Sequence, residues 1–70
     1  MEKFIVNGRI NSRYIEEKEF SSHKSAEKYV DSLCTKYDLQ VEEIISENNS
    51  NLFLVDYHNE FSIKQINFYF

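Results

Sequence analysis

One stretch of the sequence, residues 22–37, has helical periodicity, and the segments on both sides of it do not. Its apolar residues recur at intervals of three and four, which places them on one face of a helix. Ser21 and Ser22 precede this stretch, and serine is a preferred cap for the start of a helix. We therefore expect one helix over residues 22–37, with an apolar face made of Ala26, Tyr29, Val30, Leu33 and Tyr37.

The residues before this helix have the pattern of a β-hairpin, with two possible turns. Asn7-Gly8 lies between two apolar segments, and Asn-Gly is the strongest short hairpin signal. This turn predicts strands at residues 2–7 and 9–20. Asn11-Ser12 is a competing turn, and it predicts strands at residues 3–10 and 13–20 instead.

After the helix the pattern changes to the two-residue period of β-strands. A first strand begins at Val41 and ends in the polar stretch at residues 48–51, and residues 52–55 are apolar on both sides, which is typical of a central strand. His58-Asn59 predicts the next turn. Ile63 and Ile66 fall on opposite sides of the last strand, which predicts a β-bulge near residues 64–65 or fraying of the strand.

The predicted element order is ββαβββ, with one helix packed on an antiparallel sheet. This order defines an α+β two-layer fold, and 70 residues suffice for a single domain, residues 1–70. The single cysteine, Cys34, excludes a disulfide framework and indicates a reducing compartment, so we expect a cytoplasmic protein. We find no apolar run of the length that a signal peptide or a membrane span needs.

The net charge of −4 comes entirely from the last thirty residues. Up to Gln40 the chain has seven acidic and seven basic residues. After Gln40 it has five acidic residues and one basic residue, Lys64. Glu43 shares a side of its strand with Glu47, whereas Glu42 lies on the other side, so any acidic surface must include strand edges and turns. The candidate protein-binding residues are Glu42, Glu43, Glu47, Asp56 and Glu60.

Catalysis and metal binding have little support in the sequence. Cys34 could pair with His23 or His58 as a nucleophile, but its place beside the apolar helix face favours a packing role. The best pair of metal ligands, Asp56 and His58, supplies two groups without the short paired spacings of zinc sites. We expect a protein that is not an enzyme and that uses no metal and no cofactor.

The sequence favours a small acidic protein that occupies the basic, nucleic-acid-handling surface of a partner protein. The chain is rich in Asn, Lys, Ile, Phe and Tyr, a composition typical of AT-rich genomes. In size, acidity and this composition it resembles the small phage or mobile-element proteins that inhibit host defences, anti-CRISPR proteins among them. That resemblance implies an inhibitor that acts in the host cytoplasm.

Two alternatives belong to other classes of function. A nucleic-acid-binding accessory domain would use basic residues of the N-terminal hairpin and the helix start, namely Arg9, Arg13, Lys24 and Lys28. A self-associating structural module would use the aromatic C-terminus, Phe68, Tyr69 and Phe70, as the edge of a homodimer. The alternative, which the sequence favours, is that these aromatic residues pack in the core of the monomer.

Overall fold

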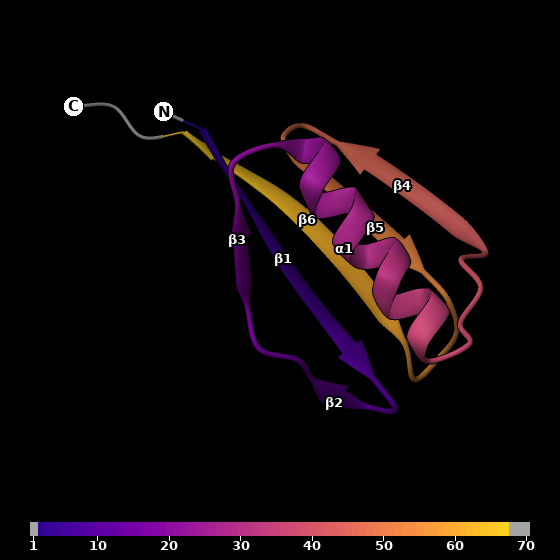
Figure 1. The fold of residues 1–70 in the computed structure, drawn as a ribbon. Helices are drawn as coiled ribbons and strands as arrows, with labels where there is room; N and C mark the ends of the chain where they lie inside the picture. Colours follow the sequence, from indigo (N-terminus) through magenta and orange to yellow (C-terminus); the bar gives the residue numbers. More distant parts are fainter. Residues whose placement is uncertain (1, 68–70) are drawn as a thin grey trace.

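A computed structural model describes residues 2–67 of the chain, and its elements form two layers (Figure 1). The described elements are β1 (Glu2–Ile10), β2 (Arg13–Tyr14), β3 (Lys18–Phe20), α1 (His23–Lys36), β4 (Glu43–Glu47), β5 (Ser50–Leu54) and β6 (Glu60–Asn67). The predicted α+β fold with one helix on an antiparallel sheet is confirmed.

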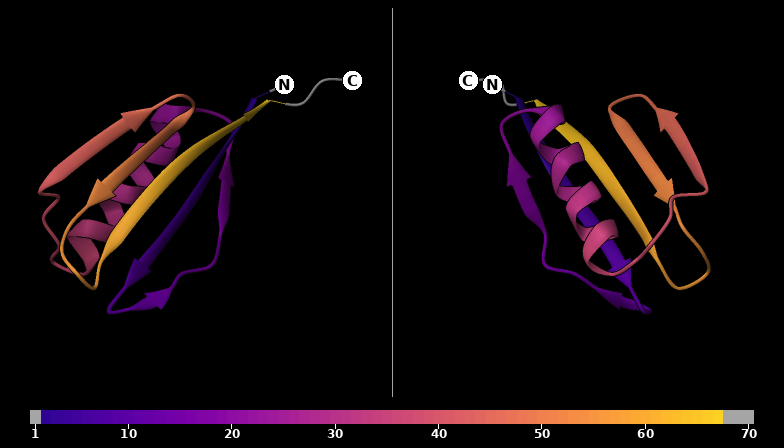
Figure 2. Two further views of the ribbon diagram at one scale, coloured as in Figure 1. Left: turned by 180° about the vertical axis from the view of Figure 1, so that it is seen from behind. Right: turned by 45° about the vertical axis from the view of Figure 1, so that its right-hand side comes forward.

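The strands form one antiparallel sheet in the order β2-β1-β6-β5-β4, and β3 also pairs with β1. The first and last strands of the chain therefore lie side by side at the centre. Helix α1 contacts β1, β3 and β6 and covers one face of this central part, while the β4–β5 hairpin extends beyond it (Figures 1 and 2).

Helix α1 begins and ends as its sequence predicts. The Ser22 hydroxyl accepts a hydrogen bond of 3.1 Å from the backbone N–H of Ser25, which satisfies one of the free donors of the first turn. Ala26 and Val30 are fully buried against the sheet. The helix ends at Tyr37, and Asp38 adopts a positive φ of 55°. The predicted helix, residues 22–37, is confirmed.

The predicted turn at Asn7-Gly8 is wrong, because β1 runs without interruption from Glu2 to Ile10. The competing prediction is confirmed, since the chain reverses at Asn11-Ser12, where φ is 52° and 65°. Gly8 serves a different purpose: it lies opposite Phe61 on the face that α1 covers. A Cβ atom at Gly8 would lie 2.6 Å from Phe61 Cδ1, so glycine supplies room for the ring.

The second predicted strand, residues 13–20, is divided into β2 and β3 by a change of register. Val6 pairs with Lys18 and Arg9 pairs with Tyr14, so residues 15–17 lie opposite residues 7–8. Three residues of this segment thus lie opposite two residues of β1, and the one extra residue has the effect of a β-bulge. It allows both Ile15 and Phe20 to pack against the core although they have opposite parity in the sequence.

The β-bulge predicted near residues 64–65 is wrong. Strand β6 pairs with β1 in one continuous register from Glu60 to Asn67. Ile63 is buried under α1, and Ile66, on the other face, is half-buried, so the change of parity reflects apolar residues on both faces. The turn predicted at His58-Asn59 is a longer connection, residues 55–59. The predicted self-association residues Phe68, Tyr69 and Phe70 lie outside the described residues.

The core lies between α1 and the face of the sheet that carries Gly8 and Phe61. Its buried members come from the helix and from three strands: Phe4, Val6, Ile10, Ala26, Val30, Phe53, Phe61 and Ile63. No core residue comes from β4, whose five residues are all exposed. The β4 end of the sheet is therefore outside the region that α1 stabilises.

Candidate functional site: the open face and the β4 edge of the sheet

The face of the sheet opposite α1 is an extended surface whose side chains follow from the strand register. We call it the open face. Residues that pair directly in an antiparallel sheet point to the same side. One row across the open face therefore contains Glu43 of β4, Leu54 of β5, Glu60 of β6, Arg9 of β1 and Tyr14 of β2.

Two further rows complete the middle of the open face. One row reads Ile45, Leu52, Ser62 and Asn7, and the next reads Glu47, Ser50, Lys64, Ile5 and Glu19. Ile5 is buried on this face because long charged side chains on both neighbouring strands flank it. The open face is thus a mixture of half-buried aliphatic and charged residues.

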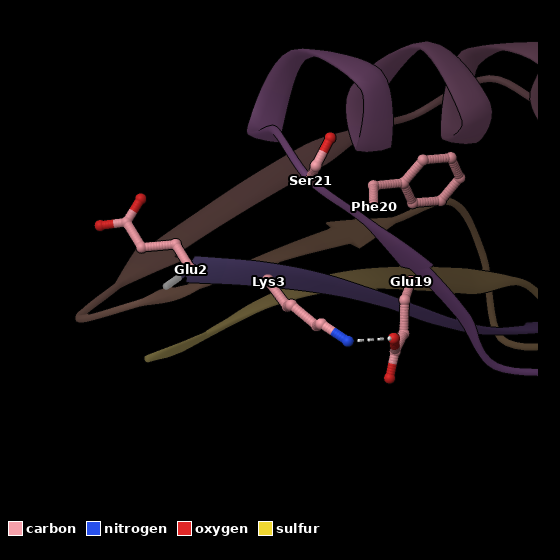
Figure 3. A pocket seen from close by; sticks show the side chains of 5 residues that line it. All are labelled: Glu2, Lys3, Glu19, Phe20 and Ser21. Carbon is pink, nitrogen blue, oxygen red and sulfur yellow. Dashed lines mark hydrogen bonds and ion pairs between the residues drawn. The ribbon is translucent and has the colours of Figure 1, made fainter. Parts of the chain in front are cut away.

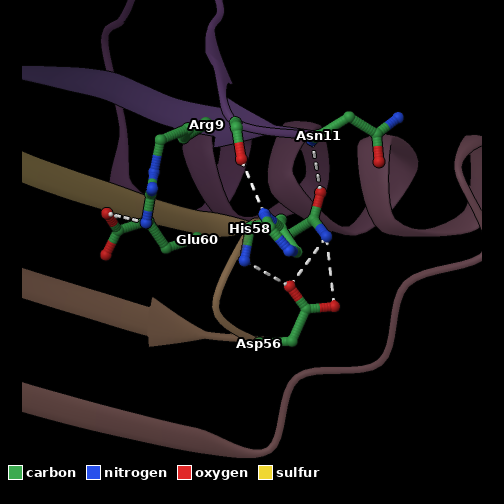
Figure 4. A network of polar contacts seen from close by, with 7 residues as sticks. Arg9, Asn11, Asp56, His58 and Glu60 are labelled. Carbon is green, nitrogen blue, oxygen red and sulfur yellow. Dashed lines mark hydrogen bonds and ion pairs between the residues drawn. The ribbon is translucent and has the colours of Figure 1, made fainter.

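One of the predicted binding residues, Glu60, already has a cationic partner within the chain. Its Oε1 atom accepts a hydrogen bond of 3.0 Å from Arg9 Nη2, and both side chains are about one-third exposed or less (Figure 4). The Arg9 Nε atom is buried and makes no hydrogen bond within the described residues. The pair neutralises this part of the open face, which weakens Glu60 as a contact for a basic partner.

Another predicted binding residue, Asp56, organises the β5–β6 connection. Its carboxylate accepts hydrogen bonds from the Asn59 side chain at 2.9 and 3.1 Å and from the His58 backbone N–H at 2.7 Å. Asn59 is buried, and its Oδ1 atom accepts from the Asn11 backbone N–H at 2.8 Å (Figure 4). Hydrogen bonds from Asn59 and then from His58 lower the pKa of Asp56. Asp56 therefore helps to hold two turns together.

The remaining three predicted binding residues lie on or next to β4. Glu43 and Glu47 are at the two ends of this strand on the open face, and Glu42 precedes it, with its backbone N–H donating to Leu54 O at 2.8 Å. All three are exposed. None of them forms an ion pair within residues 2–67. The predicted acidic set is thus divided into a β4 group and two residues with internal partners.

The two edges of the sheet differ in a way that concerns binding. The β2–β3 edge consists of short strands interrupted at residues 15–17, and short or bulged edge strands resist pairing with other chains. Strand β4 forms the other edge, continuous over five residues, and no described strand pairs with its outer side. Ile44 and Ile45 in its middle are 57% and 37% exposed. Edge β4 is open to another strand.

The basic residues predicted as a nucleic-acid surface do not form one cluster. Lys24 and Lys28 lie near the start of α1, where the His23 ring contacts Phe4 at 5.7 Å. Arg9 lies at the far end of β1, about five residues or roughly 17 Å along the strand from Phe4, and Arg13 of β2 pairs with Ile10 beside it. Arg9 is also paired with Glu60. These four basic residues therefore lie in two separate places within residues 2–67.

The candidate catalytic side chains are separated and have local partners. His23 contacts Glu27 and accepts or donates a hydrogen bond with Asn51 at 2.7 Å, whereas His58 pairs with the Ser12 hydroxyl at 2.7 Å. Burial, and then the charge of Asp31, raises the pKa of Cys34, which disfavours the reactive thiolate. Within residues 2–67 no group of three or more His, Cys, Asp or Glu side chains could hold a metal ion.

Two of the surface hollows formed by the described residues offer no better site. One of about 460 Å³ lies beside the ends of β1 and β3, where Lys3 and Glu19 form an ion pair of 3.1 Å next to Phe20 (Figure 3). A polar hollow of about 150 Å³ is lined by His23, Asn51 and residues of the β4–β5 turn. Neither hollow combines a nucleophile with an oriented base, the arrangement that covalent catalysis needs. Edge β4 and the adjoining open face are therefore the best candidate site.

Comparison with known proteins gives no family to guide this assignment. No protein-family model, no curated protein and no solved structure matches the chain. Across residues 2–67, α1 falls short of the length and apolar character that would let a helix cross a membrane. The function is therefore inferred from the geometry and charge of the molecule.

Sequence reasoning identified the acidic residues of β4 but missed the importance of its apolar centre. Ile44 and Ile45 have the alternation of a half-buried strand, and that pattern predicts burial of one of them. Both are exposed because β4 lies beyond α1. The short length of the single helix relative to the number of strands is a signal that could have indicated an uncovered edge.

Proposed function

We propose that this chain is a non-enzymatic protein-binding module and that its binding surface is edge β4 with its three unpaired carboxylates. The observation that carries the proposal is the exposure of Glu43 and Glu47 on a strand that α1 leaves uncovered, and of Glu42 directly before it. Exposed carboxylates without internal cations favour association with a basic surface, and such attraction speeds binding and weakens with salt. The partner we expect is therefore a protein with a basic surface.

The proposed surface contains fewer residues than the acidic set predicted from the sequence. Glu60 and Asp56 have internal partners, so they contribute less to the charge that a partner would meet. The single cysteine supports a cytoplasmic location. Inhibition of a nucleic-acid-handling partner, as in phage or anti-CRISPR inhibitors, stays a prediction that depends on the identity of that partner.

A capture experiment with charge-matched variants tests the proposal. The chain is immobilised and exposed to a lysate of its source cells at increasing salt concentration. The variant Glu42→Gln/Glu43→Gln/Glu47→Gln is compared with Glu16→Gln/Glu17→Gln/Asp31→Asn, which removes the same charge from exposed residues elsewhere. We expect basic proteins to be captured by the wild type and the control variant and lost by the β4 variant.

Two results would contradict the proposal. Equal capture by both variants would show that the carboxylates of β4 are not the binding surface. Retardation of DNA or RNA by the wild-type chain at low salt, abolished by Lys24→Gln/Lys28→Gln, would favour the nucleic-acid alternative.

A further inference from the structure

The backbone of edge β4 has hydrogen-bonding groups that the sheet does not use. The two-residue turn at residues 48–49 is closed by the pair Glu47–Ser50, and such a closing pair exchanges backbone hydrogen bonds. Because these bonds alternate along an antiparallel pair, Glu43, Ile45 and Glu47 bond toward β5. The N–H and C=O groups of Ile44 and Ser46 therefore point outward from the sheet.

The side chains of β4 form a different pattern on each face. On the open face a carboxylate, an aliphatic side chain and a second carboxylate follow one another as Glu43, Ile45 and Glu47. Successive members are about 6.8 Å apart along the strand. On the other face Ile44 and Ser46 carry no charge. An added strand would meet acidic groups at both ends of β4 and an apolar centre.

A second copy of the chain is a poor occupant of this edge. Antiparallel pairing of β4 with the β4 of a second copy involves all five residues when the two-fold axis lies at Ile45. It places Glu43 opposite Glu47 of the other copy, and the same contact occurs twice by symmetry. Like charges directly opposite one another on adjacent strands are destabilising. The carboxylates of β4 therefore act against self-pairing and select a basic strand.

We propose that edge β4 binds an extended segment of a partner protein by strand addition, and that this segment carries Lys or Arg opposite Glu43 and Glu47 with an apolar residue opposite Ile45. The inference rests on the proposed function and specifies the binding mode and the partner segment. Backbone hydrogen bonds to Ile44 and Ser46 supply affinity, and alternate side chains supply specificity.

Synthetic peptides test this inference on the wild-type chain. The probe is a short peptide in which threonines alternate with a lysine, a valine and a second lysine, in that order. Its binding is measured by fluorescence anisotropy at low salt. We expect binding that is lost when both lysines are replaced by glutamate. The variant Glu43→Gln/Glu47→Gln should bind several-fold more weakly, whereas the charge-matched control Glu16→Gln/Glu17→Gln should bind as the wild type does.

N-methylation of the peptide distinguishes strand addition from charge attraction alone. In antiparallel addition, which we infer here, the peptide residues opposite Ile44 and Ser46 are the threonines, so their N–H groups face β4. Methylation of the threonine nitrogens removes those bonds and should weaken binding about tenfold, a loss equivalent to about one or two hydrogen bonds. Methylation of the lysine and valine nitrogens, which face away, should leave binding unchanged.

Failure of strand addition and failure of the proposed function would give different results. Equal binding of both methylated peptides, with the lysines still required, would overturn strand addition and leave the acidic binding surface intact. Failure of the parent peptide to bind would overturn the inference, and the capture experiment would then decide the proposed function separately. A wild-type dimer in sedimentation that Ile45→Lys disperses would show that a second copy occupies the edge, and this too would overturn the inference.

Discussion

Substitution of Gly8 by alanine should destabilise the fold through the Phe61 ring. The new Cβ would lie 2.6 Å from Phe61 Cδ1 and 3.0 Å from the Glu60 carbonyl oxygen, both closer than van der Waals contact. Phe61 has no exposed surface and lies in the core beside Val6 and Ile63, so the ring has little room to move. Overpacking of this kind costs about 1–3 kcal/mol.

The loss is large enough to measure in a domain of this size. A change of about 1 kcal/mol shifts the melting temperature of a 60–100-residue domain by roughly 4–8 °C. We would measure unfolding of wild type and Gly8→Ala by circular dichroism, with heat and with urea. The matched control is Asn7→Ala, since Asn7 is exposed on the open face and its replacement should change stability by less than about 0.5 kcal/mol.

A double-mutant cycle identifies the cause. Phe61→Leu removes the ring that the new methyl group meets, so Gly8→Ala should cost much less in that background than in the wild type. Equal costs in the two backgrounds would refute the steric explanation. A large loss for Asn7→Ala as well would instead indicate that Asn7-Gly8 acts as a turn, contrary to the uninterrupted strand β1.

Three further predictions concern the turns and the helix. Asn59→Ala removes the donor to Asp56 and the acceptor of the Asn11 N–H, and we expect urea unfolding to show a loss of about 1–3 kcal/mol, whereas no loss would contradict the role of Asn59. The lowered pKa of Asp56 stabilises the fold above its unfolded pKa of about 3.9, and this contribution is lost as the pH falls through the folded pKa. The stability difference between wild type and Asp56→Asn should therefore narrow in acid, and a difference that grows below pH 4 would contradict the reasoning. Ser22→Ala removes the N-cap of α1 and should cost about 1 kcal/mol in thermal unfolding, with Ser32→Ala, whose hydroxyl donates within the helix, as the milder control.

The helix and the general architecture could be predicted because they depend on local patterns. The spacing of Ala26 and Val30 and the cap at Ser22 lie within one segment, and their predicted roles are confirmed. Asn7-Gly8 misled the sequence analysis for a physical reason. The same glycine that permits a turn also permits close approach of a ring, and Phe61, which requires that space, is distant in the sequence.

The register of the sheet was less predictable. The extra residue at 15–17 can be recognised only when β1 is known to pair on that side with both β2 and β3. The change of side between Ile63 and Ile66 in β6 likewise indicated a bulge. In the structure Ile66 simply lies on the face that α1 does not cover. A parity change in a sequence does not distinguish a bulge from a strand that is apolar on both faces.

For the candidate site, the sequence predicted which carboxylates share a face but not which of them are available. The opposite sides of Glu42 and Glu43 follow from strand periodicity alone. The partner of Glu60 is Arg9, and the network of Asp56 extends to Asn11 through Asn59. These contacts join segments that are far apart in the sequence, so charge counting could not separate the internally paired residues from those on β4.

The central position of β6 affects when the chain can fold during its synthesis. Strand β6 pairs with both β1 and β5, and it leaves the ribosome after all the other described strands. Until then β1 lacks its main neighbour, and of the strand pairs only the β4–β5 hairpin and the short pairings of β1 with β2 and β3 can form. Such long-range pairing delays folding. The sheet can therefore assemble only after β6 has left the ribosome, and a ribosome stalled within residues 60–67 should hold an unfolded, protease-sensitive chain.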